Sequence, residues 1–566
     1  MRRRLSIIAA LAALGLATAA APAPAAPRPA PRNPVTAGVA DTFADPAVIR
    51  GDDGYWYAYG TSDPLRSGER TPHLLPILRS TDLAAWSYVG DAFTARPAWA
   101  TPTAGVWAPD IRRAGDRWLL YYTVTDTTLN PGDDSAIGVA TAPTPTGPWT
   151  DSGAPLVGPR AAPGGGFLWT FDPAGLTDAN GQRWLYYGSY FGGIWTVPLS
   201  SDGLRVTGAA TQVTIDNRYE GAYVVRHDGW YYLFGSAANC CAGPTTGYSV
   251  FAGRSMSPTG PFVDRTGASL LASRVGGTPV IQPNGNRWIG TGHNAVVTSQ
   301  GRDWFVYHAI DRANPYLDEP FGINRRPMLV DRLDWVGGWP TVRGGDWASD
   351  VTAPDESWKW AEKVKRPDPR WSEEFAAAPS PAWSWVRPDP NATVTGGALR
   401  WPTQAADLVG TGNDAGVLLR TAPVGDWVVE TKLSIDLGID SVRNYQQAGL
   451  VVYASDDDFA RLSHVAIWNT RQIEYGRELP YAGQLSYGGM VEGPPAETTW
   501  LRLAHRTDRT GEHEYRAATS TDGIHWTWGG VWTFPAGPAP RIGLVAHGGD
   551  DPPATALFDY VRFYRG

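Results

Sequence analysis

The sequence predicts an all-β protein, with an N-terminal five-bladed β-propeller followed by a C-terminal β-sandwich of the jelly-roll type. Short aromatic segments recur five times within the first 350 residues, where helical periodicity is nearly absent. After residue 370 the pattern changes to alternating strands separated by Asp- and Gly-containing turns. At 566 residues the chain is also too long for one ordinary core, so two domains are expected.

The start of the chain predicts export. Met1 is followed by three arginines, a short apolar stretch and a run of small residues, the pattern of a secretory signal peptide over residues 1–26. A membrane anchor is a weaker interpretation, because the apolar stretch is short and no charged stop-transfer segment follows it. Residues 27–35 are Pro-rich and predict a semi-rigid tether. We expect a secreted, extracellular protein with no membrane association after cleavage.

The five aromatic segments predict the propeller over residues 36–350. They are "GYWYAYGT", "DRWLLYYTVT", "QRWLYYGSY", "GWYYLFGSA" and "RDWFVYHAI", with tryptophans at Trp56, Trp118, Trp184, Trp230 and Trp304. Short strands and turns lie between them, and "TGPW" at 146–149 and "TGPF" at 259–262 repeat the same turn. A long repeat made of several short strands is typical of a propeller blade.

A polar residue in apolar company precedes each aromatic segment at a similar distance from its tryptophan. The five positions are Asp45 in "FADPAVI", Asp110 in "VWAPDI", Asp172 in "TFDPAGL", Glu220 in "RYEGAYV" and His293 in "GTGHNAVV". Equivalent blade positions lie at equal depth around one axis, so these side chains should converge at one end of the channel. One Asp-Pro step is usually a turn. Burying four carboxylates and a histidine at matched positions is costly unless they share a task, so the ring is our candidate active site.

The composition limits the classes of binding partner that we expect. The net charge is -8 and the basic residues are scattered, which disfavours nucleic acid and anionic membranes as partners. The 27 tryptophans and 24 tyrosines suit stacking on sugar rings, and equally suit strand cores. The only cysteines, Cys240 and Cys241, are adjacent, so they form either a strained vicinal disulfide or two free buried thiols.

The ordered motifs of residues 41–345 resemble glycoside hydrolase family 43, five-bladed propeller enzymes that include arabinanases, α-L-arabinofuranosidases and β-xylosidases. The motifs are "ADPAVI", "WAPDI", "FDPAGLTDANG", "YEGAYV", "GRSMSPTGPF", "GTGHNAVV", "DWFVYHAI" and "LDWVGGWP". The resemblance implies that Asp45 is the general base, Glu220 the general acid, and Asp172 the carboxylate that tunes the pKa of the acid and orients the substrate. It also implies inversion, in which the base activates a water on the far face of the sugar.

The resemblance implies further roles around the ring. Four residues are expected to contact the sugar, to wall its pocket or, alternatively, to support or pack the structure: Asp110, Trp107, Phe171 and Tyr219. Of the pair Arg325 and Arg326, we expect Arg326 to contact substrate. His293 is similar to a histidine that helps to hold calcium or another ion in arabinan-cleaving relatives, although imidazole is an unusual calcium ligand and a packed core histidine is the alternative.

The C-terminal third is predicted to be an accessory domain. Residues 351–370 are charged and Pro-bearing, and predict a linker. Residues 371–566 resemble the concanavalin-like sandwich appended to many family members, with "AGLVVY" and the closing "FDYVRFY". Three roles remain open for it: binding polysaccharide, shaping the mouth of the propeller, or stabilising the protein without touching sugar.

Together these features predict a secreted, monomeric, inverting glycoside hydrolase that cleaves α-L-arabinofuranosyl linkages of plant cell-wall arabinan or arabinoxylan and uses no organic cofactor. A β-xylosidase or an exo-acting galactan hydrolase of the same family is the alternative within this class. A non-catalytic sugar-binding propeller is the alternative from another class. The three carboxylates Asp45, Asp172 and Glu220 disfavour it, because binding alone needs no paired acid and base.

Overall fold

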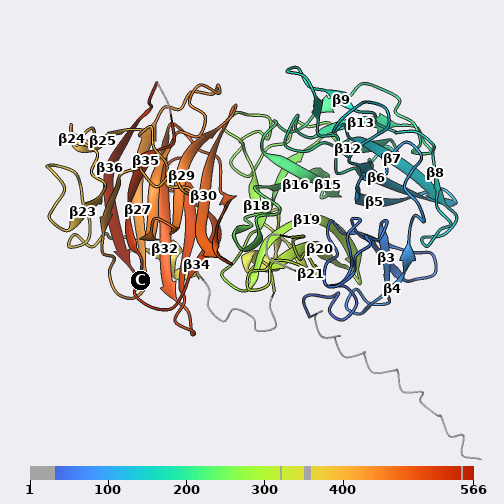
Figure 1. The fold of residues 1–566 in the computed structure, drawn as a ribbon, viewed down its shortest axis with the longest axis horizontal. Coiled ribbons are helices and arrows are strands. Elements are labelled where there is room, and N and C mark those ends of the chain that lie inside the picture. Colours follow the sequence, from blue (N-terminus) through green and yellow to red (C-terminus); the bar gives the residue numbers. More distant parts are fainter. Residues whose placement is uncertain (1–31, 319–321, 350–357, 550–551) are drawn as a thin grey trace, which may run out of the picture. The chain divides into compact units, whose positions relative to one another are not determined.

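The computed structural model describes residues 32–318, 322–349, 358–549 and 552–566. Within these ranges almost every regular element is a β-strand (Figure 1). The predicted signal peptide and residues 27–31 of the predicted tether lie outside the described residues, as do residues 350–357. No helix in the described ranges has the length and apolar character needed to cross a bilayer.

The N-terminal part contains five four-stranded antiparallel sheets, each with its strands in sequence order. Blade 1 is β1 (Ala47–Arg50), β2 (Trp56–Tyr59), β3 (Pro76–Ser80) and β4 (Trp86–Asp91), and blade 2 is β5 (Val106–Ala114), β6 (Arg117–Val124), β7 (Ala136–Ala142) and β8 (Thr150–Asp151). Blade 3 is β11 (Ala174–Thr177), β12 (Arg183–Tyr187), β13 (Trp195–Leu199) and β14 (Thr211–Gln212), preceded by the hairpin β9 (Arg160–Ala161) and β10 (Phe167–Leu168). Blade 4 is β15 (Tyr219–His227), β16 (Trp230–Ala237), β17 (Ser249–Ser255) and β18 (Thr278–Ile281), and blade 5 is β19 (Trp288–Ser299), β20 (Arg302–Asp311), β21 (Met328–Val336) and β22 (Trp339–Val342).

The five first strands close a ring. Each contacts the first strand of the next blade, and β19 of blade 5 returns to contact β1 of blade 1. The segment before β1 joins the two ends of the ring, because the Val35 N–H donates to the Met328 carbonyl (3.0 Å) and the Phe43 N–H to the Arg326 carbonyl (2.9 Å). The predicted five-bladed propeller is therefore confirmed.

The C-terminal part contains two seven-stranded sheets that face each other, which confirms the predicted sandwich (Figure 1). One sheet has the order β23 (Trp383–Val386), β26 (Val417–Arg420), β35 (Arg541–His547), β28 (Gln447–Ser455), β29 (Asp458–Ile467), β30 (Thr470–Tyr481) and β31 (Gln484–Val491). The other has the order β24 (Thr393–Thr395), β25 (Ala398–Pro402), β36 (Thr555–Arg565), β27 (Trp427–Ile435), β32 (Thr498–Thr507), β33 (His513–Ser520) and β34 (Thr527–Phe534). Apolar side chains from both sheets, including Leu450, Ile473, Leu501 and Phe563, form one buried core.

Short 3₁₀ turns complete the described structure. They are η1 (Gly243–Thr245), η2 (Arg343–Gly345) and η3 (Trp358–Lys363). The last lies in the predicted linker, where Trp358 and Ala361 are buried against β27, β32 and β36 residues of the sandwich. The described residues form one compact unit, and the predicted boundaries at residues 350 and 370 stay a prediction.

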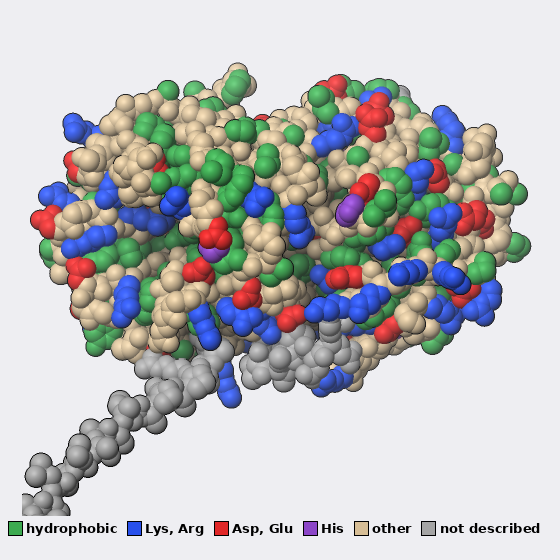
Figure 2. Space-filling model, turned by 180° about the vertical axis from the view of Figure 1, so that it is seen from behind, with side chains coloured by type: hydrophobic (Ala, Val, Ile, Leu, Met, Phe, Trp, Pro, Cys, Tyr) green, Lys and Arg blue, Asp and Glu red, His purple; other side chains and the backbone are tan. Residues whose placement is uncertain are grey.

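The sandwich contacts blades 4 and 5 through polar pairs. Arg312 makes two hydrogen bonds with the Glu512 carboxylate (3.2 and 2.6 Å), and the Gln282 amide donates to the Val491 carbonyl (3.1 Å). On the face shown in Figure 2, basic and acidic side chains are mixed. This mixing gives no extended field of one sign on that face.

Candidate active site

The site is built on a backbone turn that recurs at the inner end of every blade. One residue per blade has a left-handed backbone there: Asp45 (φ 53°), Ala108 (φ 46°), Asp172 (φ 57°), Gly221 (φ 58°) and His293 (φ 50°). Side-chain-bearing residues rarely adopt this conformation, and where they do the strain often marks a functional position. Asp45, Asp172 and His293 occupy the turn itself, whereas Glu220 lies one residue before it.

A second ring of polar side chains holds these turns. At or near the end of the second strand of each blade stands a hydroxyl residue or, in blade 5, a histidine: Thr61, Thr123, Ser189, Ser236 and His308. Four of them accept the backbone N–H of the turn in the next blade: Ala108 to Thr61 (3.0 Å), Asp172 to Thr123 (3.0 Å), His293 to Ser236 (2.9 Å) and Asp45 to His308 (3.2 Å). The fifth, Ser189, donates to the Glu220 carboxylate instead (2.8 Å). The side chains of the second ring thus fix the orientation of the turns and of the Glu220 carboxylate.

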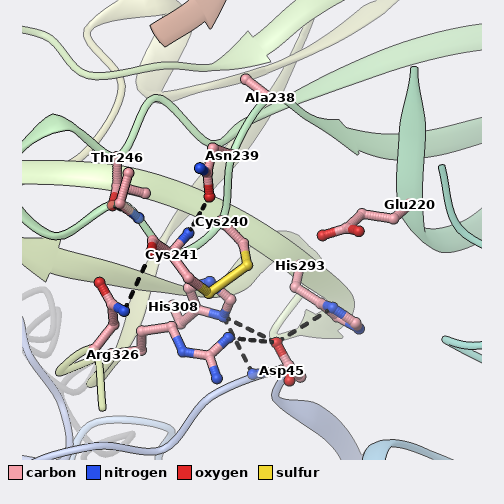
Figure 3. The surroundings of a disulfide bond; sticks show 12 residues. Asp45, Glu220, Ala238, Asn239, Cys240, Cys241, Thr246, His293, His308 and Arg326 are labelled. Carbon is pink, nitrogen blue, oxygen red and sulfur yellow. Dashed lines mark hydrogen bonds and ion pairs between the residues drawn. A yellow bond between two sulfur atoms is a disulfide. The ribbon is translucent and has the colours of Figure 1, made fainter. Parts of the chain in front are cut away.

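Cationic and neutral donors surround the Asp45 carboxylate. The Arg326 guanidinium lies 3.4 Å from its Oδ1, His293 Nδ1 lies 3.3 Å from the same oxygen, and the Thr61 hydroxyl donates to Oδ2 (2.5 Å). Figure 3 shows Arg326, His293 and His308 converging on Asp45. Burial alone would raise the pKa of Asp45, but the positive charge of Arg326 and the donors around the carboxylate lower that pKa well below its usual value. Asp45 is therefore held ionised.

Both histidines near Asp45 are buried, and their protonated forms are disfavoured. Burial lowers the pKa of His293, and burial lowers the pKa of His308 to about 4. His308 Nδ1 accepts the Asp45 N–H, which assigns its proton to Nε2. His308 thus acts as a neutral acceptor that positions the Asp45 turn.

Calcium was expected beside His293, and the side chains there do not supply its ligands. They are one carboxylate, two imidazoles and the Arg326 guanidinium, whereas calcium takes six to eight oxygens. Among the described residues no group of three or more His, Cys, Asp or Glu side chains is placed to hold a metal. The calcium ion stays a prediction.

Glu220 and Asp172 form a close pair on neighbouring blades. The Gly221 N–H, one residue after Glu220, donates to Asp172 Oδ2 (2.9 Å). Burial, followed by the charges of Glu220 and Asp45, raises the pKa of Asp172 well above its usual value. Burial also raises the pKa of Glu220, although hydrogen bonds from Tyr248 and Ser189 oppose the rise; the charge of Asp45 adds a smaller contribution in the raising direction. The pair therefore retains a proton at a pH where Asp45 is ionised.

The other predicted site residues divide into two groups. The rings of Trp107 (41% exposed) and the half-buried Phe171 lie edge to face, with their centroids 6.2 Å apart. Both rings are accessible, as a wall of a sugar pocket requires. Tyr219 is 1% exposed and its hydroxyl donates to the Gly276 carbonyl, so its placement as a pocket wall is corrected: it packs in the core of blade 4. It points away because side chains alternate along a strand, and its neighbour Glu220 faces the channel.

Asp110 has a supporting position. It lies two residues beyond the turn of its blade, is 4% exposed, and accepts hydrogen bonds from Arg112 (2.8 Å) and from the Gly175 N–H of blade 3 (2.7 Å). It therefore ties two blades together. Arg326 faces Asp45 as described, whereas Arg325 pairs with Asp41 (2.8 Å) outside the ring.

Several site features were missed from sequence. The second ring was visible as a Ser, Thr or His near the end of each aromatic segment, but its residue type varies from blade to blade. Two aromatic residues that continue the wall were also missed: Trp169 stacks on Phe171 (5.5 Å) and Phe191 lies edge-on to Trp169 (4.9 Å). Cys240 and Cys241 form a vicinal disulfide, one of the two alternatives left open.

A five-bladed propeller that gathers carboxyl groups whose pKa values are shifted in opposite directions has the architecture of a glycoside hydrolase, and this is the class to which the chain belongs. More narrowly, the chain is a member of glycosyl hydrolases family 43, whose family model matches residues 31–340.

Known relatives cover the propeller half of the chain. The chain is 31% identical over 324 residues to the extracellular exo-α-(1→5)-L-arabinofuranosidase ArbA of Cellvibrio japonicus, covering 53% of this chain and 85% of that protein. It is 30% identical over 307 residues to the extracellular endo-α-(1→5)-L-arabinanase 1 of Bacillus subtilis, covering 52% and 86%. A solved α-L-arabinanase from Cellvibrio cellulosa, complexed with arabinohexaose, matches with 28% identity and a TM-score of 0.45, covering 53% and 95%.

Proposed function

We propose that this protein is an inverting glycoside hydrolase that cleaves α-L-arabinofuranosyl linkages in arabinan or arabinoxylan. The observation that carries the proposal is the opposite bias of two carboxyl groups in one ring: the surroundings lower the pKa of Asp45 and raise the pKa of Glu220. Glycoside hydrolysis by inversion needs one carboxyl group of each kind on opposite sides of the scissile bond.

In this mechanism Asp45 is the general base. Its carboxylate takes a proton from a water molecule, which attacks the anomeric carbon from the face opposite the leaving group. Arg326 and the Thr61 hydroxyl keep the carboxylate ionised and oriented before the water arrives. The His308 acceptor fixes the backbone of Asp45 by holding its N–H.

Glu220 is the general acid. Its proton passes to the glycosidic oxygen as the bond breaks, so the leaving sugar departs as an alcohol and not as an alkoxide. Asp172 accepts the Gly221 N–H, which opposes part of the rise in its own pKa. Two neighbouring carboxyl groups disfavour joint ionisation, so one proton stays with the pair and is available to the acid.

The proposed sugar specificity and the proposed extracellular location have separate support. Relatives at about 30% identity are named for action on α-(1→5)-linked arabinan, and two of them are named extracellular. The signal-like residues 1–26 support export of this chain as well. Trp107 and Phe171 offer accessible rings against which the apolar face of a furanose packs.

A substrate panel tests the proposal. Aryl α-L-arabinofuranoside, aryl β-D-xyloside, aryl β-D-galactoside and debranched arabinan are incubated with the enzyme, and proton NMR follows the anomer that is first released. We expect arabinose or arabino-oligosaccharide of inverted configuration. Hydrolysis of the xyloside or galactoside alone, or release of the retained anomer, would overturn the proposal.

A further inference from the structure

Beside Glu220 the structure has a pocket of ≈ 450 Å³ that propeller and sandwich build together. Its lining includes Glu220, Trp169, Phe191 and Cys240 from the propeller, and Trp468 and Tyr487 from the sandwich. Asp45 does not line it, so the pocket extends from the acid and away from the base. The mechanism above uses only Glu220 of this set.

We propose that this pocket is a leaving-group subsite that binds one sugar ring of the polysaccharide, and that Trp468 and the Cys240–Cys241 disulfide are its specificity-determining walls. The inference rests on the proposed function. A general acid protonates the leaving-group oxygen, so the departing part of the chain must lie on the side of Glu220. The pocket is the space on that side.

The turn that carries Trp468 is held in place by hydrogen bonds within the sandwich and to the propeller. It lies in the turn between β29 and β30, is 45% exposed, and has a left-handed backbone (φ 52°) that a bulky residue rarely adopts. The Trp468 N–H donates to Asn444 (2.7 Å), and the neighbouring Asn469 side chain bonds Asp216 (2.6 Å) and Asn217 (2.9 Å) shortly before Glu220. An exposed indole kept in a strained turn against the strand of the acid indicates a contact surface and not a packing residue.

The disulfide is held on the other side of the pocket by the sandwich. The Cys241 N–H donates to Asn239 (2.9 Å), and the Ser486 hydroxyl of β31 donates to the Ala242 carbonyl (3.1 Å). Figure 3 shows the Glu220 carboxylate pointing toward the disulfide. Two linked sulfur atoms present a polarizable surface without hydrogen-bond donors, which suits the C–H face of a sugar ring.

Glycines bring the backbones of the propeller and the sandwich into direct contact beside the disulfide. A Cβ on Gly247 would lie 1.9 Å from the Gly489 carbonyl oxygen, and one on Gly488 would lie 2.3 Å from that of Thr245. The backbone of β31 therefore lies directly against the loop that follows the disulfide, and no side chain fits between them. The positions of Trp468 and the disulfide are thus fixed relative to each other by the same sandwich sheet.

Polar groups between these walls suit sugar hydroxyls. Asn217, Gln472 and Glu474 line the pocket beside the apolar rings and the disulfide. A few polar groups among apolar walls are typical of a site that orients a small ligand. The structure thus assigns the sandwich a part in substrate binding, one of the three roles that the sequence left open.

The test compares a substrate that fills the pocket with one that does not. kcat/KM is measured for arabinotriose and for methyl α-L-arabinofuranoside, whose methyl group leaves the pocket empty. Trp468→Ala should lower the ratio of the two values on the order of tenfold, the loss expected for one ring-stacking contact. Trp468→Phe should restore most of the ratio. Trp526→Ala, at a half-buried tryptophan of the same domain that lines a different pocket, should leave the ratio unchanged.

Reduction tests the second wall. The chain has only 2 cysteines, so a phosphine reductant has one disulfide to cleave, and Cys241 is exposed to it. Reduction should lower the same ratio, with a Cys240→Ser/Cys241→Ser variant as the insensitive control. An unchanged ratio after both Trp468→Ala and reduction would overturn this inference while arabinofuranoside hydrolysis persists. If neither substrate is cleaved by the wild type, the proposed function itself fails.

Discussion

The surroundings of Asp45 and those of Glu220 are built from the same blade repeat, yet they bias a carboxyl group in opposite directions. Asp45 sits beside a guanidinium and accepts from a hydroxyl, whereas Glu220 faces Asp172 and receives only neutral donors. Asp45 is buried and Glu220 is half-buried, and burial taken alone would raise the pKa of each carboxyl group. The cation beside Asp45 decides the difference. Blades with the same backbone thus provide opposite electrostatic surroundings, because a few side chains around the channel differ between them.

Removing either carboxyl group should have the largest effect. Asp45→Asn and Glu220→Gln keep the shape of each side chain but remove the base or the acid, so each should lower kcat on arabinan on the order of 10²–10⁴-fold. Melting temperature serves as the control for folding. Activity within a fewfold of wild type in either variant would remove that residue from the mechanism.

Exchanging the cation tests the Asp45 side of the comparison. Without the guanidinium, Arg326→Gln should raise the pKa of Asp45 because the largest effect that opposes burial is lost. The base must be ionised to act, so the acidic limb of the pH profile of kcat/KM should move to higher pH. Arg325→Gln is the matched control, since Arg325 pairs with Asp41 and not with Asp45. Equal shifts in both variants would refute a specific role for Arg326.

The Glu220 side is tested by removing the neighbouring carboxylate. Asp172→Asn keeps an acceptor for the Gly221 N–H but removes the carboxyl group whose ionisation competes with that of Glu220, so the pKa of Glu220 should fall. Activity needs Glu220 protonated and declines as pH rises through its pKa. The alkaline limb of kcat/KM should therefore move to lower pH. A limb that stays in place would mean that burial alone sets the pKa of the acid.

A buried carboxyl group outside the channel shows what burial does without a catalytic partner. Burial raises the pKa of Glu492 to about 8, despite hydrogen bonds from the Gly530 N–H and the Gln282 amide. Because the folded-state pKa exceeds the unfolded value, this group stabilises the fold at low pH, and that stabilisation is lost as pH rises toward about 8. Glu492→Gln should flatten the decline of melting temperature between pH 5 and 8 and leave the shape of the activity profile unchanged. A decline as steep as that of wild type would contradict the shift.

Much of the site could be predicted from the sequence because the blade repeat puts Asp45, Asp172, Glu220 and His293 at recurring distances from a tryptophan. Side-chain direction could not be predicted as well: Tyr219 and Glu220 are adjacent, and only the local strand register decides which one faces the channel. The position of Trp468 could not be predicted for a different reason. It comes from another domain, and its place beside Glu220 depends on docking contacts between residues far apart in the chain.

The most direct test of the assigned roles varies the leaving group. Aryl α-L-arabinofuranosides with leaving-group pKa values from about 4 to 10 are hydrolysed by Glu220→Ala and by Asp45→Ala, and log kcat/KM is plotted against leaving-group pKa. A leaving group of low pKa needs no proton, so Glu220→Ala should approach wild-type rates at that end of the series and fall steeply toward the other. Asp45→Ala should be slow throughout. A flat dependence in Glu220→Ala, or a steep one in Asp45→Ala, would contradict the assignment of acid and base.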